Sequence, residues 1–195
     1  MNAIRIRRAA GAVAVAAVLP LGLTAWAAGP ASAAPAPDQP FGPACASLPQ
    51  EGEGSAAGMA DDPVATAASN NPALSTLASA VQKAGLVDTL NKAENITVFA
   101  PTNEAFAKIP KAQLDQVLND KAALTKILIY HVVGQKITPQ QMQDGSFETL
   151  EKGTLTTSGS GESYKVNNTA NVVCGNVQTA NATVYVIDSV LMPKM

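Results

Sequence analysis

The sequence predicts an α+β domain in which most helices precede a group of short strands. Apolar residues recur at helical spacing through much of residues 71–128, whereas strand patterns separated by turn residues fill the chain from Phe147 onward. Between the helical patterns, the stretch 95–110, NITVFAPTNEAFAKIP, indicates a buried strand that runs directly into a helix. Helices and strands that are segregated along the chain are typical of α+β domains.

The N-terminal residues 1–34 indicate a secretory signal peptide. Three arginines precede an apolar run over Ala9–Ala28, and small residues then fit cleavage after Ala33 or after Ala34. No other part of a twin-arginine signal follows the paired arginines, so we expect the general export route. A lipid anchor needs a cysteine directly after the signal, whereas Cys45 lies well downstream. We expect a secreted, extracellular protein, free or associated with the cell wall, without a membrane span.

Removal of the signal makes the chain more acidic. The 13 basic residues lose three arginines, which leaves ten lysines against 15 acidic residues, a net charge of minus five. The mature chain then contains no arginine, the residue best suited to bidentate binding of phosphate. This composition argues against nucleic acid and acidic membrane surfaces as partners.

Residues 35–58 are rich in proline, glycine and alanine, and we expect a flexible leader ahead of a domain over 59–195. The chain has two cysteines, Cys45 and Cys174, and an even pair in an exported protein is best interpreted as a disulfide. The bond would close a loop of 129 residues and stabilise the fold by roughly 5 kcal/mol in the chain-entropy model. The alternative is a reactive thiol at one cysteine.

The domain is predicted to begin near Met59 with helices. Asn71 is suited to cap a helix that has Pro72 at its first position, and Gly85 ends the apolar repeat that follows. A short second helix over 86–90 leads to the central strand.

The central strand is predicted over 97–99, because β-branched and aromatic residues suit a pleated sheet. Pro101 ends this strand because proline has no N–H to donate. Thr102 is suited to cap the next helix, with Glu104 in the positive first turn and Pro110 after its end.

Two more helices are predicted over 114–118 and 120–128, the second capped by Asp120. Thr138 to Gln141 forms the pattern of a capping box that opens a short helix. Beyond Phe147 the strand patterns are FETL, GTLTTS, SYKVN, ANVVCGNVQ and ATVYVIDSVLM, with a hairpin tip at 158–161.

Three motifs in this order resemble signatures of the fasciclin domain family. TVFAPTNEAF at 97–106 is similar to the first signature, ILIYHVVG at 127–134 to the tyrosine-histidine motif, and ATVYVIDSVLMP at 182–193 to the C-terminal signature. The chain looks most like the secreted, immunogenic fasciclin proteins of the mycobacterial type. The resemblance implies a bacterial source and a wedge of two small packed β-sheets with helices covering one side.

His131 is the only histidine, which excludes a histidine-rich metal site and restricts any Ser-His-Asp arrangement to this residue. We find no nucleophile with a base, no metal cluster and no cofactor fingerprint, and we predict a protein that is not an enzyme and needs neither metal nor cofactor. We interpret His131 as a core residue. Because buried polar groups need partners, we expect Thr102, His131 and Asp188 to form one structural polar cluster.

The family resemblance implies a monomeric binding module for cell adhesion that contacts extracellular matrix, integrins or other cell-surface partners. In animal members the tyrosine-histidine motif is linked to integrin binding. An aspartate-isoleucine pair of some animal members has no counterpart at 175–177, which read Gly-Asn-Val. The candidate adhesion motif that corresponds to the tyrosine-histidine motif consists of Leu128, Ile129, Tyr130, His131, Val132 and Val133.

A second hypothesis is a structural or carbohydrate-binding protein of the producer's own cell envelope, which would bind envelope polysaccharide. Only two aromatic residues of the kind that stack on sugars, Tyr164 and Tyr185, lie in the predicted strands. An unrecognised hydrolase that uses His131 is a third hypothesis.

Overall fold

The protein is described here by a computed structural model over residues 39–49 and 51–193. The predicted signal peptide, residues 1–34, lies outside the described residues. The division of the remaining chain at residue 58 into a leader and a domain stays a prediction.

Seven α-helices form within the described residues, and capping side chains set several of their ends. The Thr102 hydroxyl accepts the Ala105 N–H at 3.2 Å, as predicted. Asn71 accepts the Ala73 N–H at 2.9 Å, but it caps a 3₁₀ turn, Pro72–Leu74, and the α-helix that ends at Gly85 begins only at Ser75. Gly85 ends its helix with a φ of 75°, a conformation that favours glycine. The helices are α1 (Gly58–Asp61), α2 (Val64–Asn70), α3 (Ser75–Ala84), α4 (Val87–Lys92), α5 (Asn103–Ala107), α6 (Lys111–Asn119) and α7 (Lys121–Tyr130), with 3₁₀ turns at Pro43–Ser47 and Pro72–Leu74.

The helix predicted after Thr138 does not form. The Thr138 N–H donates to the Gln141 side chain at 2.9 Å, so one bond of the capping box is present. Residues 139–142 nevertheless make only turns, because the chain enters a strand at Asp144.

The strands form one sheet of seven strands, in the order β2-β1-β7-β6-β5-β4-β3. The expected pair of small sheets is therefore wrong. The long strand β6 pairs with β5 along one part and with β7 along another, which makes the sheet continuous. A bridge between Val133 and Thr149 brings the two ends of the sheet together and nearly closes it. The strands are β1 (Ile96–Pro101), β2 (Val132–Val133), β3 (Asp144–Glu148), β4 (Thr154–Ser160), β5 (Ser163–Val166), β6 (Ala170–Gln178) and β7 (Ala182–Ile187).

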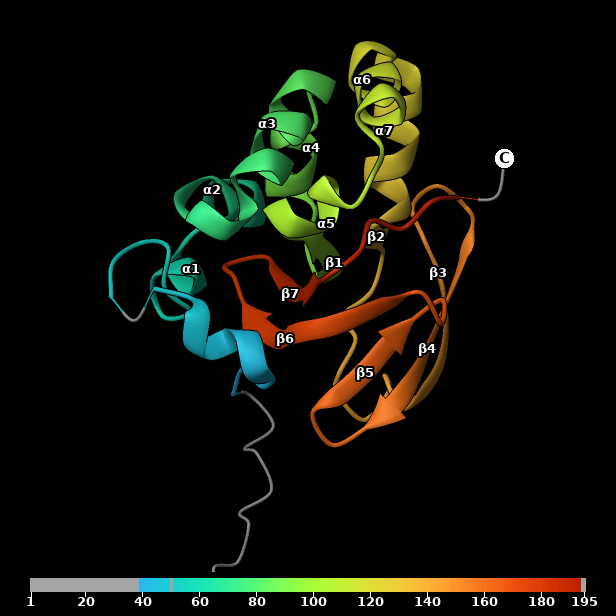
Figure 1. The fold of residues 1–195 in the computed structure, drawn as a ribbon. Helices are drawn as coiled ribbons and strands as arrows, with labels where there is room; N and C mark the ends of the chain where they lie inside the picture. The colour runs from blue at the N-terminus through green and yellow to red at the C-terminus, as the bar shows by residue number, and fades with distance from the viewer. Residues whose placement is uncertain (1–38, 50, 194–195) are drawn as a thin grey trace, which may run out of the picture. The chain divides into compact units, whose positions relative to one another are not determined.

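Strands β1 and β7 lie side by side and parallel, so the first and C-terminal motifs are neighbours. Figure 1 shows the helices gathered on one side of this pair, with β3, β4 and β5 on the other. Successive side chains alternate between two cores. Val98 and Val184 face the helices, whereas Phe99 and Tyr185 stack at 5.8 Å in the second core, within the curved sheet.

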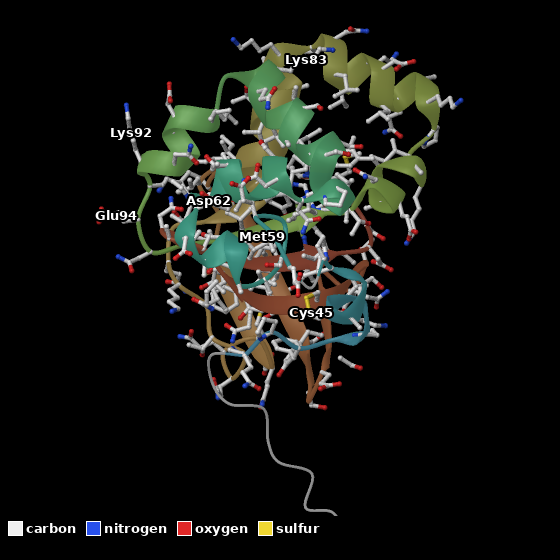
Figure 2. The ribbon with its side chains drawn as sticks, turned by 90° about the vertical axis from the view of Figure 1, so that its left-hand side faces the viewer. Cys45, Met59, Asp62, Lys83, Lys92 and Glu94 are labelled. Carbon is white, nitrogen blue, oxygen red and sulfur yellow. A yellow bond between two sulfur atoms is a disulfide. The ribbon has the colours of Figure 1, made fainter. Side chains whose placement is uncertain are left out.

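Within residues 39–49, the predicted leader is joined to the domain at Cys45, as the expected disulfide requires, and it makes a further contact at Phe41. Phe41 exchanges two backbone hydrogen bonds with Gly175 of β6, and its ring packs edge-on against Tyr164 at 5.2 Å. Gly175 lies so close to the Phe41 ring that a Cβ there would clash. Cys45 forms the predicted disulfide with Cys174, and Figure 2 shows Cys45 with its sulfur beside the sheet. Phe41 and Cys45 thus lie against β6 beyond the residues that pair with β5.

Replacing both cysteines should destabilise the domain. The Cys45→Ala/Cys174→Ala variant loses the constraint on a loop of 129 residues, for a cost of up to roughly 5 kcal/mol, while the Phe41–Gly175 pairing remains. Urea denaturation of the variant and of the oxidised parent measures the difference. Reduction of the parent should reproduce the variant's midpoint, and equal midpoints for the oxidised parent and the variant would contradict a stabilising role.

Candidate functional site

The candidate adhesion motif, Leu128–Val133, lies where α7 ends and β2 begins. Five of its six side chains are buried, with exposed fractions from 1% for Val133 to 6% for Tyr130, and Ile129 is half-buried. Buried side chains offer little surface to a partner. The two polar members of the motif, Tyr130 and His131, instead hold other chain segments in place.

Tyr130 connects α7 to β4 and to the turn between β5 and β6. Its hydroxyl donates to the Thr154 carbonyl at 3.2 Å and accepts from the Asn167 amide at 3.0 Å. The same Asn167 side chain accepts the Thr156 N–H at 2.9 Å, so it joins β4 to the turn between β5 and β6. The Tyr130 ring packs on Gly153, where an added Cβ would approach the ring to 2.6 Å.

His131 connects α7 to the C-terminal segment. Its Nδ1 lies 2.8 Å from the Ile127 carbonyl and therefore carries the hydrogen, while Nε2 accepts the Leu191 N–H at 3.0 Å. Burial disfavours the imidazolium and lowers the pKa of His131 to about 4, although the bond to Ile127 opposes the shift. The neutral ring thus holds two chain segments together.

The expected polar cluster of Thr102, His131 and Asp188 does not form, because each side chain has other partners. The Thr102 hydroxyl is occupied at the start of α5, and both nitrogens of His131 bind backbone groups. Asp188 accepts from the backbone and side chain of Asn171, at 2.8 and 2.9 Å, and from Lys108 and Ser189. Burial alone would raise the pKa of Asp188, but these hydrogen bonds outweigh burial and leave it lowered.

Tyr130 and its partners border an open groove with a volume of about 680 Å³. Its lining includes the apolar residues 190–193, which we call the apolar wall, and a set of residues with hydroxyl and amide groups, which we call the polar wall. We call this hollow the Tyr130 groove. It is lined by Tyr130, Glu151, Gly153, Thr154, Thr156, Asn167, Thr169, Val190, Leu191, Met192 and Pro193.

Neither a metal centre nor a spanning helix is found in the part of the chain that the structure describes. Over residues 39–49 and 51–193, no three His, Cys, Asp or Glu side chains lie where they could hold a metal ion. In the same ranges, no helix is long and apolar enough to cross a membrane. The two cysteines are bonded to each other, which rules out a thiol nucleophile in the oxidised protein.

These features define a class of protein: a disulfide-bonded α+β module whose polar core residues hold the fold and frame a surface groove. A sequence model of the fasciclin domain matches residues 72–193, and the chain belongs to this family. Fasciclin proteins of the mycobacterial type are among its relatives, as the motifs predicted.

Two mycobacterial relatives match at about half of the aligned positions. The cell surface glycolipoprotein MPB83 of Mycobacterium bovis is 55% identical over 147 residues, which cover 73% of this chain and 66% of the relative. The chain therefore spans just under two thirds of that protein. The immunogenic protein MPT70 of Mycobacterium tuberculosis is 49% identical over 160 residues, which cover 78% of this chain and 81% of the relative.

A solved structure shows the same fold at low sequence identity. The FAS1 domain pair of the insect cell adhesion molecule Fasciclin I superposes with a TM-score of 0.57 at 18% identity, covering 69% of this chain and 52% of that one. At this identity the likeness concerns the fold alone.

Sequence reasoning missed Asn167, Gly153 and Leu191, which complete the surroundings of Tyr130 and His131. Asn167 and Asn168 both adopt a positive φ, of 52° and 55°, as in the tight turns that join hairpin strands. Two consecutive asparagines between strand patterns were the available signal for this turn. No local pattern marks Leu191, because its partner lies 60 residues away.

The single histidine makes the electrostatics of the core directly testable. A pKa of about 4 in the folded state lies below the value of about 6.5 expected for an unfolded histidine. Stability from the neutral ring should thus be complete above pH 6.5 and fall by about 3 kcal/mol as the pH drops toward 4. An NMR titration of the one imidazole, with urea midpoints over this range, measures both effects. His131→Gln should lack the decline, and a folded-state pKa near 6.5 would contradict burial.

The bond between Tyr130 and Asn167 can be measured by a double-mutant cycle. Tyr130→Phe removes only the hydroxyl, and Asn167→Gly removes the amide but tolerates the positive φ. Each variant should lose about 1 to 2 kcal/mol of unfolding free energy. The double variant should lose less than the sum of the two, because both remove one shared bond. Purely additive losses in urea denaturation would refute the contact.

Proposed function

We propose that the protein is a secreted, non-enzymatic binding module that attaches to extracellular matrix or to a cell-surface partner through the Tyr130 groove. The names of the relatives, a cell surface glycolipoprotein and an immunogenic protein, support an extracellular location. The predicted signal peptide agrees with this location.

The groove itself is the observation that carries the proposal. Its volume of about 680 Å³ and its mixed lining are typical of a recognition surface, in which apolar groups contribute binding energy and polar groups fix orientation. Met192 exposes 40% of its surface at the apolar wall. Thr154, Thr156 and Thr169 of the polar wall are exposed.

The tyrosine-histidine motif enters this function indirectly. Tyr130 lines the groove, and its hydroxyl holds the polar wall through Asn167. His131 holds the apolar wall through Leu191. Substitution of either residue should therefore weaken adhesion by displacing a wall, although neither side chain need bond to the partner.

Binding of envelope polysaccharide is the second candidate function. The row of hydroxyl and amide groups on the polar wall favours it, since these groups suit sugar hydroxyls. The two strand tyrosines do not: Tyr164 and Tyr185 expose only 3% and 0% of their surfaces and offer no ring for stacking.

A binding panel with one groove variant tests the proposal. The oxidised, secreted protein is applied to immobilised collagen, fibronectin, integrin-bearing cells and purified envelope polysaccharide. We expect saturable binding to a matrix or cell target that weakens at least tenfold in Thr154→Arg, because the long cation fills the groove. Thr89→Arg places the same substitution at an exposed site of α4, outside the groove, and should bind like the parent.

Each outcome of the panel decides between the candidates. Saturable binding to polysaccharide alone would favour the second candidate, a protein that binds the producer's own envelope. Equal binding by the two arginine variants would show that the partner does not bind in the groove. Binding to no target would refute both candidates.

A further inference from the structure

The apolar wall of the Tyr130 groove is a chain segment whose backbone is only partly paired. Residues 190–193 follow β7 without belonging to a helix or strand, and Figure 1 shows them as the red segment that leads from β7 to the C-terminus. The Leu191 N–H is bonded to His131. The backbone groups of Val190 and Met192 make no hydrogen bond to any residue that the structure describes. Two residues that line the groove thus have backbone groups without a partner in the described chain.

The exposure of successive side chains indicates which way these groups face. Leu191 is 2% exposed and lies in the second core, whereas Met192 is 40% exposed and Val190 is half-buried. This alternation is that of an extended chain, in which neighbouring N–H groups point to opposite sides. Because the Leu191 N–H points to His131, the N–H and C=O of Val190 and Met192 point away from it. They present the donor and acceptor pattern of an unpaired strand edge.

The segment is held in place before any partner arrives. His131 fixes Leu191 from one side, and Pro193 restricts the backbone at its end. A preformed edge loses little conformational entropy when a strand is added to it, which favours binding.

Charge on the groove indicates the kind of strand that would fit. Glu151 lines the groove and is bonded to Lys126 through Oε1 at 3.5 Å, while Oε2 faces Gly153 and has no hydrogen bond among the described residues. The mature chain as a whole carries more acids than lysines. A lysine or arginine on an incoming segment would therefore find a carboxylate oxygen in the lining of the groove.

We propose that the Tyr130 groove binds an extended, basic peptide segment of a partner protein, which pairs as a strand with the backbone of Val190 and Met192. An apolar residue of that segment packs on Met192, and a basic residue reaches Glu151. This inference rests on the proposed function and specifies its partner. Backbone pairing supplies affinity in this mode, and the side-chain contacts supply selectivity.

Two variants of one residue separate backbone pairing from side-chain contact. Met192→Pro removes the Met192 N–H, and an extended chain accepts proline there. Met192→Ala removes the side chain but keeps the N–H. Random linear twelve-residue peptides on phage, selected on the oxidised parent protein, serve as the probe. Selected peptides should be basic and should bind Met192→Pro roughly tenfold more weakly than Met192→Ala, since one strand hydrogen bond is lost.

The design keeps this inference apart from the proposed function, because it needs no matrix or cell target. The NMR signal of His131 and the urea midpoint show that each variant is folded. Equal affinities for the two Met192 variants would exclude backbone pairing, and selected peptides that lack basic residues would exclude the role of Glu151. Selection of no peptide, with binding of polysaccharide in the panel, would overturn the inference in favour of a sugar ligand.

Discussion

The parallel pairing of β1 with β7 is the constraint on which the rest of the fold depends. Six residue pairs, from Ile96–Ala182 to Pro101–Ile187, join strands that are buried on both faces. Parallel neighbours need a long connection, and here the connection contains three helices and five strands. The other strands extend the sheet from this pair, and the helices cover the face that carries Val98 and Val184.

The tyrosine-histidine motif serves this arrangement by joining parts that the β1–β7 pair does not reach. Tyr130 reaches the far strands through Thr154 and Asn167, and His131 reaches the segment beyond β7 through Leu191. The motif thus connects three separate stretches of chain, namely α7, the strands at Thr154 and Asn167, and the segment after β7. An effect of its substitution on adhesion would follow from loss of these connections, without any contact between the motif and a partner.

Sequence patterns predicted the features that depend on neighbours along the chain. Local chemistry was enough to predict the strand that runs into the helix capped by Thr102, and the end of α3 at Gly85. The pairing of Cys45 with Cys174 followed from the presence of only two cysteines in the sequence. The single sheet and the docking of Phe41 on Gly175 depend on long-range pairing that periodicity does not encode. The Thr102–His131–Asp188 cluster was a wrong prediction of the same kind. Each residue was correctly expected to need partners, but backbone groups, Asn171 and Lys108 supply them.

The disulfide also determines how the domain carries mechanical load. Tension between the two ends of the described chain passes from Cys45 to Cys174 through the sulfur–sulfur bond, so the 129-residue loop between them is shielded from stretching. Strand β7 and residues 190–193 lie outside that loop. A pull on the C-terminal side therefore loads residues 190–193 directly, and these residues form one wall of the groove. Such a pull would deform a ligand site there while the 129-residue loop stays closed.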